Sequence, residues 1–285
     1  MGKLFENLDI IFYPLMVGIL LSITAAVLGV VLVLKRYSMI GDGLSHVSFG
    51  VFAILMALSP VIKNLSYEKI TYIAIPIVMI VAYILLRIGE STKIKGDAAI
   101  GLISSAALAI GYFVGSLSEG FTKDINSMMF GSIVLANKKD FLIILPVCLI
   151  VIFIFVFLYN RIFSVTFDEE FAKATGIKTE RYTLLLSIFT ALTIVIGMRI
   201  LGSLLISSLI IFPSLSAMKL FKTYKSVTIA SAVESEIAFF IGFVISYVLS
   251  LPTGASIVVV HLCIYLLAVI VKSISTQMVK MHHKI

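Results

Sequence analysis

Asp42 and His46 are the residues of this chain whose types and spacing most clearly suggest chemistry. They lie four residues apart in the segment YSMIGDGLSHVSFG, residues 37–50, which carries no other charged side chain. An i, i+4 pair on a helix points two side chains the same way, so the carboxylate and the imidazole could contact one ion. Such donors suit Zn²⁺ and Mn²⁺, although two ligands do not complete the shell of either ion. The pair therefore predicts part of a divalent metal site.

A second copy of the chain could supply the missing ligands. Gly43 and Gly50 share one stripe of the same expected helix, where they would let two backbones approach closely. Two copies meeting through this stripe about a symmetry axis would bring together two Asp and two His ligands. In the alternative, Asp42 merely caps a helix that starts late, and His46 is hydrogen-bonded within the helix bundle.

The elements that must position this pair are hydrophobic along the whole chain. Of its 285 residues, 60% are hydrophobic and only 13% are charged, and the mean hydropathy is +1.15. Apolar runs of about 18 to 25 residues recur, each long enough to cross a membrane as a helix. We therefore expect an all-α polytopic membrane protein in which residues 1–285 form a single transmembrane domain.

The apolar runs predict nine membrane spans, with eight as the alternative. Only Met198 and Arg199 separate two of the runs, and residues 124–136 could form a short re-entrant helix. If the second span begins near Ser38, His46 lies about 12 Å into a hydrocarbon core about 30 Å thick. The nine expected spans are 11–34, 38–59, 70–88, 98–118, 140–159, 182–198, 200–218, 226–249 and 254–272.

The basic residues predict the orientation in the membrane. With the N-terminus outside, about fifteen of the 22 Lys and Arg residues fall on loops of one side, which we assign to the cytoplasm. These residues are scattered at the ends of apolar runs and form no stripe, so we expect no nucleic-acid partner despite a net charge of +7. The loops assigned to the cytoplasm contain Lys35–Arg36, Arg87–Lys95, Arg161–Arg181, Lys219–Lys225 and Lys272–Lys284.

The longest of these loops, residues 161–181, contains the segment DEEFAKATG. Its acids come first, its alanines next and its glycine last, which predicts a short capped helix. A polar loop of this length is a candidate docking surface, and a solvated connector is the alternative. The chain contains no enzyme constellation and no complete phosphate-binding loop motif, so we expect a protein that does not itself hydrolyse ATP.

Two more acids and three histidines need an interpretation. Glu234 and Glu236 lie in an apolar run, two residues apart, so they point to different sides of a helix and could serve a secondary pathway. His261 is expected to be a hydrogen-bonded core histidine. His282 and His283 are interpreted as a solvated tail, with a weak metal contact as the alternative.

Several segments together resemble one protein family. YSMIGDGLSHVSFG resembles the GDALSH-type motif in the second span of metal-importing ABC permeases, the membrane subunits of bacterial zinc and manganese uptake systems. The resemblance covers nearly the whole chain. It continues through GDAAIGLISSAALAIG, NSMMFGSIVLAN, FDEEFAKATGIKTERYTLLLSIFTALTIVIGMRILGSLLISSLIIFPSLSA and ISYVLSLPTGASIVV.

This resemblance implies the ABC importer permease fold in a bacterial cytoplasmic membrane. It implies a homodimer, two cytoplasmic ATP-binding subunits and an extracellular metal-binding protein, with Asp42 and His46 lining the metal pathway. The resemblance assigns no role to Glu234 or Glu236. The resemblance further implies a coupling helix seated on the ATPase, to which it assigns Asp168, Glu169, Glu170, Phe171, Ala172 and Gly176.

The leading hypothesis is a permease subunit of an ATP-driven importer of a divalent transition metal. We expect no permanently bound cofactor. The transported ion would be Zn²⁺ or Mn²⁺, because two Asp and two His satisfy tetrahedral zinc, and with added waters octahedral manganese. One alternative is a proton- or cation-coupled secondary carrier in which Asp42 and His46 relay protons. Another is a sensor or scaffold that only binds the ATPase.

Overall fold

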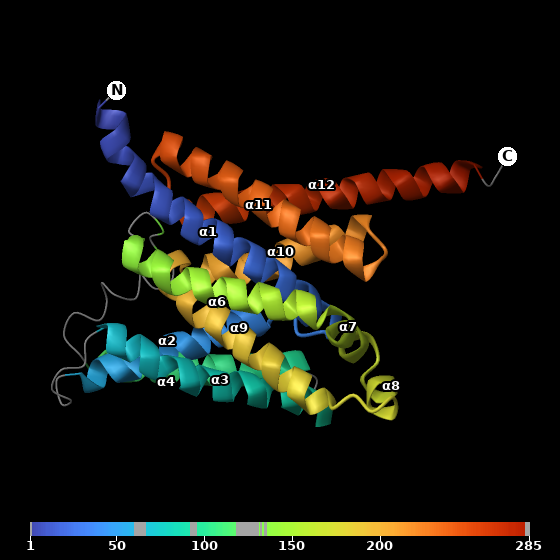
Figure 1. The fold of residues 1–285 in the computed structure, drawn as a ribbon, viewed down its shortest axis with the longest axis horizontal. Helices are drawn as coiled ribbons and strands as arrows, with labels where there is room; N and C mark the ends of the chain where they lie inside the picture. The colour runs from blue at the N-terminus through green and yellow to red at the C-terminus, as the bar shows by residue number, and fades with distance from the viewer. Residues whose placement is uncertain are drawn as a thin grey trace.

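The computed structural model describes residues 2–59, 67–91, 96–117, 131, 133 and 136–282. Their secondary structure is helical, with no strand in the described part. Figure 1 shows the helices gathered into one elongated bundle, with the described N-terminal end at the opposite end from α7 and α8. The helices are α1 (Gly2–Leu34), α2 (Ile40–Leu58), α3 (Tyr67–Ser91), α4 (Gly96–Gly115), α6 (Lys138–Phe157), α7 (Tyr159–Phe167), α8 (Glu169–Ala174), α9 (Thr179–Leu201), α10 (Ser203–Leu220), α11 (Tyr224–Leu249) and α12 (Thr253–His282).

Within the described ranges, nine helices are long and apolar enough to cross a membrane, namely all except α7 and α8. The expected all-α membrane fold is confirmed, with nine candidate spans and not eight. The break between α9 and α10, however, lies at Gly202 and not at Met198 and Arg199. Gly202 has a φ of 86°, in the left-handed region that glycine tolerates best, so it ends α9. Arg199 lies inside α9, where its Nη2 atom is 3.7 Å from Oδ1 of Asp140.

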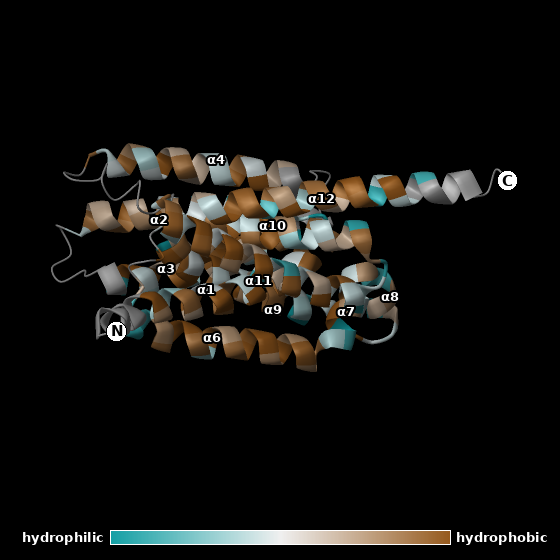
Figure 2. Ribbon diagram, turned by 90° about the horizontal axis from the view of Figure 1, so that it is seen from above, coloured by the Kyte–Doolittle hydropathy of each residue, from teal (hydrophilic) through white to brown (hydrophobic). Residues whose placement is uncertain are grey.

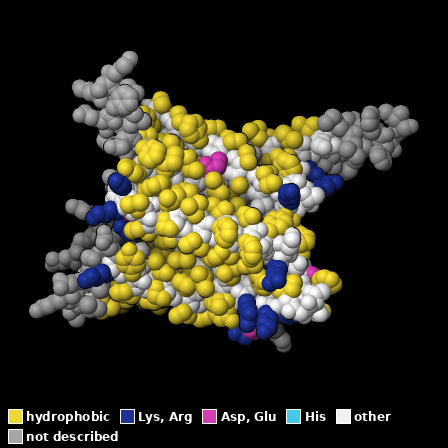
Figure 3. All heavy atoms as spheres, viewed as in Figure 1, with side chains coloured by type: hydrophobic (Ala, Val, Ile, Leu, Met, Phe, Trp, Pro, Cys, Tyr) yellow, Lys and Arg dark blue, Asp and Glu magenta, His cyan; other side chains and the backbone are white. Residues whose placement is uncertain are grey.

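The surface of the bundle is typical of a protein surrounded by lipid. Figure 2 shows that most helical segments are hydrophobic, and Figure 3 shows a broad hydrophobic surface with Lys and Arg gathered toward its two ends. Large apolar side chains are exposed along α4, α6, α11 and α12. In water such a surface would drive aggregation, whereas in a bilayer it contacts acyl chains. The re-entrant helix expected at 124–136 falls largely outside the described residues.

The helices of the bundle separate into two sides. α2 packs mainly against α4 and also against α3, α9 and α10, whereas α11 packs against α1, α12 and α10. Figure 1 shows α2, α3 and α4 on one side and α11 and α12 on the other. Residues on α2 and α11 therefore belong to different parts of the protein.

The glycine stripe of α2 is closed within the chain. A Cβ atom added to Gly43 would lie 2.3 Å from Cγ2 of Ile100, and one added to Gly50 would lie 2.4 Å from the carbonyl oxygen of Ala107. Both neighbours belong to α4, which runs beside α2 in the same direction. The expectation that two copies meet through this stripe is wrong, because α4 already covers it.

Helix α7 was not predicted from the sequence, which indicated a connector before the capped helix. Its aromatic residues recur every four positions and meet Tyr224, the first residue of α11. The ring centroids of Tyr159 and Phe163 lie 5.1 and 5.2 Å from that of Tyr224, and that of Phe167 lies 6.0 Å away. This cluster joins α7, which follows α6 in the chain, to the first turn of α11.

Candidate functional site

The start of α2 fixes the position of Asp42. Arg36 has a φ of 65° in the turn after α1, and the hydroxyl of Tyr37 donates a hydrogen bond of 2.8 Å to the carbonyl oxygen of Leu86 on α3. Met39 then occupies the N-cap position and its side chain makes no capping hydrogen bond. Asp42 lies inside the first turn, so the alternative that it is the cap residue is wrong. Its carboxylate is favoured there by the positive end of the helix dipole.

Asp42 and His46 point the same way, as their spacing predicted. The Nε2 atom of His46 lies 3.7 Å from Oδ1 of Asp42. This separation exceeds a normal hydrogen bond. Two donor atoms each about 2.1 Å from a tetrahedral zinc ion lie about 3.4 Å apart. The pair is thus within a few tenths of an ångström of the spacing at which both side chains bind one ion.

The pair lies well inside the length of the bundle. A Cβ atom on Gly41 would lie 3.5 Å from the Cα atom of Ser207 and 3.2 Å from Cδ1 of Ile210. Ser207 and Ile210 are the fifth and eighth residues of α10, so the first turn of α2 is level with the first half of that helix. The side chains of Asp42 and His46 are nevertheless 47% and 29% exposed. They are accessible from outside the single chain.

One chain could supply two ligands, Asp42 and His46, to a metal ion at this place. Among the described residues, no group of three or more His, Cys, Asp or Glu side chains is placed to hold a metal ion. A complete shell therefore needs ligands from a second chain or from water. The side chains of His282 and His283 lie outside the described residues, so the interpretation of this tail stays a prediction.

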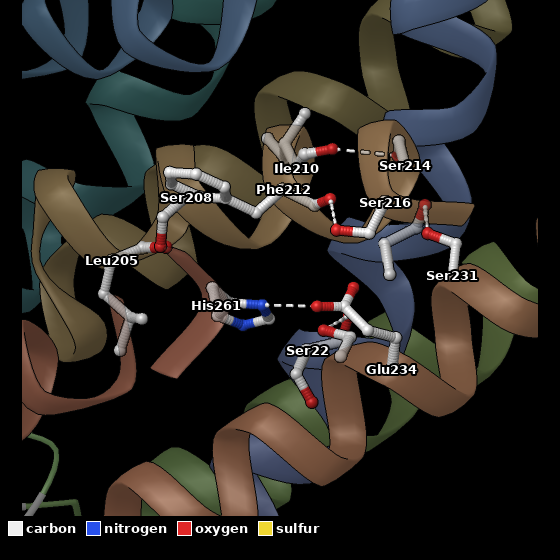
Figure 4. Close-up of polar contacts among 12 residues, drawn as sticks. Ser22, Leu205, Ser208, Ile210, Phe212, Ser214, Ser216, Ser231, Glu234 and His261 are labelled. Atoms are coloured by element: carbon white, nitrogen blue, oxygen red, sulfur yellow. Dashed lines mark hydrogen bonds and ion pairs between the residues drawn. The ribbon is translucent and has the colours of Figure 1, made fainter. Parts of the chain in front are cut away.

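Glu234 and Glu236 point to different sides of α11, as their spacing predicted. Figure 4 shows Glu234 directed toward His261 of α12. Its Oε1 atom lies 3.3 Å from Nδ1 of His261, whose side chain is completely buried and stacks on the ring of Phe212. The expectation of a hydrogen-bonded core histidine at position 261 is confirmed. Within the described part of the chain, Oε2 of Glu234 and Nε2 of His261 are buried without a partner.

Glu236 belongs to a separate contact between α11 and α1. Its Oε1 atom accepts a hydrogen bond from the hydroxyl of Ser22. Ser235 donates to the carbonyl oxygen of Ser22 at 3.2 Å, and Ser231 donates to that of Ala26 at 3.3 Å. These contacts join α11 to α1, on the other side of the bundle from α2. The i, i+4 spacing of Ser231 and Ser235 is the sequence signal that could have predicted this contact.

The capped helix expected in the long loop is α8. The Oδ1 atom of Asp168 accepts a hydrogen bond of 2.9 Å from the backbone N–H of Phe171, and Gly176 follows the C-cap with a φ of 83°. Both ends are therefore capped as the sequence predicted. Ala172 is completely buried, whereas Phe171 is 63% exposed. Glu170 is exposed as well.

Glu169 attaches α8 to the end of α1. Its Oε2 atom lies 3.6 Å from Nζ of Lys35, and its Oε1 atom lies 2.8 Å from Nζ of Lys173. Lys35 is in the turn that leads from α1 to α2. The short helix is thus linked by one ion pair to the segment that precedes Asp42.

A protein-family comparison identifies this arrangement. The model of a family described as the ABC 3 transport family matches residues 7–272. The chain belongs to the ABC 3 transport family. Its members are transport proteins, so this chain is a permease and not an enzyme, and the nine candidate spans make it a multi-pass protein of the cytoplasmic membrane.

The ABC 3 chain is similar to several curated proteins over most of its length. It is 31% identical over 268 residues to the high-affinity zinc uptake system membrane protein ZnuB of Buchnera aphidicola, covering 93% of this chain and 99% of that one. It is 28% identical to ZnuB of Haemophilus influenzae, over 91% and 97% of the two chains. It is 27% identical to the manganese import system permease protein ScaB of Streptococcus gordonii, over 89% and 88%.

The fold of this ABC 3 permease is also that of a solved structure. It superposes on a chain of PsaBC from Streptococcus pneumoniae, solved in complex with Fab, with a TM-score of 0.78 and 24% sequence identity. The match covers 94% of each chain. This confirms the expected importer permease fold.

Proposed function

We propose that the chain is the permease subunit of an ATP-driven importer that moves Zn²⁺ or Mn²⁺ across a bacterial cytoplasmic membrane. The observation that carries this proposal is the Asp42–His46 pair, which lies beside the first half of α10 at a spacing suited to one ion. The names of the relatives support it, because ZnuB is named for zinc uptake and ScaB for manganese import. ATP would be hydrolysed on separate subunits.

The functional unit would be a homodimer with the metal pathway between the two chains. With about 100° between successive residues, Asp42 and His46 point about 100° and 60° away from Gly43 around the axis of α2. They can therefore face a second copy although α4 covers the glycines. Two carboxylates and two neutral imidazoles would complete a four-ligand site in which the charges of the ion and the protein cancel.

Charge balance explains how such a site would let a divalent cation cross. A bare ion in a low-dielectric bundle is unfavourable unless ligands replace its water and opposite charge neutralises it. Asp42 would supply the charge and His46 a neutral nitrogen donor. Because both side chains are partly exposed, they could exchange ligands with water as the ion enters and leaves.

ATP binding would act on this site through α8, the coupling helix. Phe171 and Glu170 are exposed and would contact the ATPase, so α8 and the 161–181 loop would lie on the cytoplasmic side. Movement of α8 would reach the turn before α2 through the Glu169–Lys35 ion pair. An extracellular metal-binding protein would deliver the ion to the opposite end of the bundle.

The proposal is tested by metal-stimulated ATP hydrolysis in a reconstituted complex of the permease, its ATPase and the extracellular metal-binding protein. We expect Zn²⁺ or Mn²⁺ on the binding protein to stimulate hydrolysis, and a comparison of the two ions identifies the substrate. Stimulation should be absent from complexes with the Asp42→Asn, His46→Ala permease. Metal uptake into vesicles that contain the permease without any ATPase would instead support the secondary carrier.

A further inference from the structure

A basic pocket lies beside the coupling helix and has no part in the metal pathway. It is formed by Arg161 of α7, by the loop between α8 and α9, and by the first turn of α9. Three of its lining side chains are cations. They are Arg161 of α7, Lys178 of the loop between α8 and α9, and Arg181 of α9. The basic pocket is lined by Arg161, Thr175, Gly176, Ile177, Lys178, Arg181 and Tyr182.

The three cations of the basic pocket lack acidic partners. Among the described residues, no carboxylate forms an ion pair with Arg161, Lys178 or Arg181. Within the described ranges, the side-chain partner of Arg161 is the neutral hydroxyl of Tyr182, at 3.1 Å from Nη1. Elsewhere at this end of the bundle, cations do have acidic partners, as the contacts of Glu169 and Glu180 with nearby Lys and Arg side chains show. Like charges lining one pocket repel each other unless an anion binds between them.

The basic pocket lies at the level where the membrane spans end. The candidate span of α6 ends at Phe157, that of α9 begins at Thr179 and that of α11 begins at Tyr224. The aromatic cluster of α7 and Tyr224 lies at the same end, as aromatic side chains do at the headgroup layer. Figure 1 shows α7 at this end of the bundle, between α6 and α8. The anions that are abundant at this level are phospholipid headgroups.

We infer that the basic pocket binds the phosphate of an anionic phospholipid headgroup. Guanidinium groups bind phosphate oxygens through two parallel hydrogen bonds, and a lysine adds a compact positive charge. The bound headgroup joins α7 to the start of α9, on both sides of the coupling helix. The inference concerns a site distinct from Asp42 and His46 and does not depend on which metal is transported.

The inference is tested on the purified full-length chain in detergent, by titration with phosphatidylglycerol followed by native mass spectrometry and by thermal unfolding. We expect phosphatidylglycerol to bind and to raise the unfolding temperature, and zwitterionic phosphatidylcholine to do neither. The test variant is Arg161→Gln, Lys178→Gln, Arg181→Gln. Each cation removed should weaken binding about fivefold, and the three together more than about a hundredfold.

A charge-matched control separates a built site from general attraction to a basic surface. Lys219→Gln, Lys222→Gln, Lys225→Gln removes the same charge from exposed residues at the junction of α10 and α11, outside the basic pocket. We expect this control to bind phosphatidylglycerol like the wild type. Equal loss in both triple variants, or loss in neither, would overturn the inference. If the test variant does not fold, Lys178→Gln, Arg181→Gln replaces it, because this variant keeps the Arg161–Tyr182 hydrogen bond.

Further arms of the experiment identify the source of the anion. Inorganic phosphate and ATP are titrated separately, and we expect each to bind far more weakly than phosphatidylglycerol. Equal or tighter binding of either would assign the basic pocket to a free anion instead of a lipid. Normal lipid binding by the test variant, together with loss of ATPase association, would assign the pocket to an acidic group of the partner subunit and would also overturn the inference.

Discussion

The Nζ atom of Lys35, just beyond the end of α1, lies 3.6 Å from Oε2 of Glu169, the first residue of α8. Their side chains are only 9% and 21% exposed, so the contact is largely shielded from solvent. It links α8, the proposed coupling helix, to the turn that leads into α2 and the Asp42–His46 pair. We therefore expect this ion pair to transmit movement of the ATPase to the proposed metal site.

Lys35→Gln should uncouple ATP hydrolysis from the metal. The variant loses the ion pair to α1 but keeps the exposed face of α8, so ATPase association should be normal while metal stimulation of hydrolysis falls severalfold. Lys173→Gln is the control, because the ion pair with Glu169 that it removes lies within α8. Full stimulation in the Lys35 variant, measured on reconstituted complexes, would contradict this route.

Phe171→Ala should weaken the association of the permease with its ATPase. Phe171 is exposed although it is large and apolar, and Asp168 holds it in place by capping α8. Full burial of a Phe side chain is worth about 1.5 to 3 kcal/mol. Co-purification of the two subunits measures the effect. Phe157→Ala removes an even more exposed ring from the end of α6 and should leave association unchanged.

Gly50→Ala should destabilise the protein, whereas Gly101→Ala should not. The added methyl group at position 50 would collide with the carbonyl oxygen of Ala107, and such overpacking typically costs about 1 to 3 kcal/mol. At position 101 it meets no atom within 4 Å, and alanine is the better helix former. Thermal unfolding in detergent compares the two. Equal unfolding temperatures would show that α2 and α4 are not packed as described.

The sequence predicted local features well because each depended on neighbouring residues. The i, i+4 spacing alone predicted that Asp42 and His46 point the same way, and the order of acids, alanines and glycine predicted α8 with its Asp168 cap. The spans followed from the lengths of the apolar runs. The break at Gly202 was predicted three residues too early, because the charged Arg199 interrupts the apolar run. In the structure Arg199 lies inside α9, where it forms an ion pair with Asp140.

Contacts between distant segments could not be predicted in the same way. Gly43 and Gly50 indicated close helix packing, but the sequence did not show that α4 of the same chain would take that place. Glu234 and its partner His261 are separated by 27 residues and belong to different helices. A hydrophobic pattern describes one helix and its exposed face, and does not specify which neighbour covers it.

The Glu234–His261 contact should matter for stability and not for transport. His261→Leu leaves a largely buried carboxylate without its partner, which typically costs about 1 to 3 kcal/mol. Replacing both residues, in Glu234→Leu, His261→Leu, should recover much of this loss, as a double-mutant cycle in detergent would show. We expect the double variant to retain metal uptake. Loss of uptake in a stable double variant would instead place Glu234 on a secondary pathway.

The measurement that tests the account most directly is ATP-driven metal uptake by proteoliposomes that contain the complex with the Asp42→Asn, His46→Ala permease. Asn keeps nearly the shape of Asp and Ala is a good helix former, so α2 should form and the complex should assemble normally. We predict that uptake of both Zn²⁺ and Mn²⁺ falls to the level of vesicles without ATP. Uptake at the wild-type rate by the fully assembled double variant would contradict it.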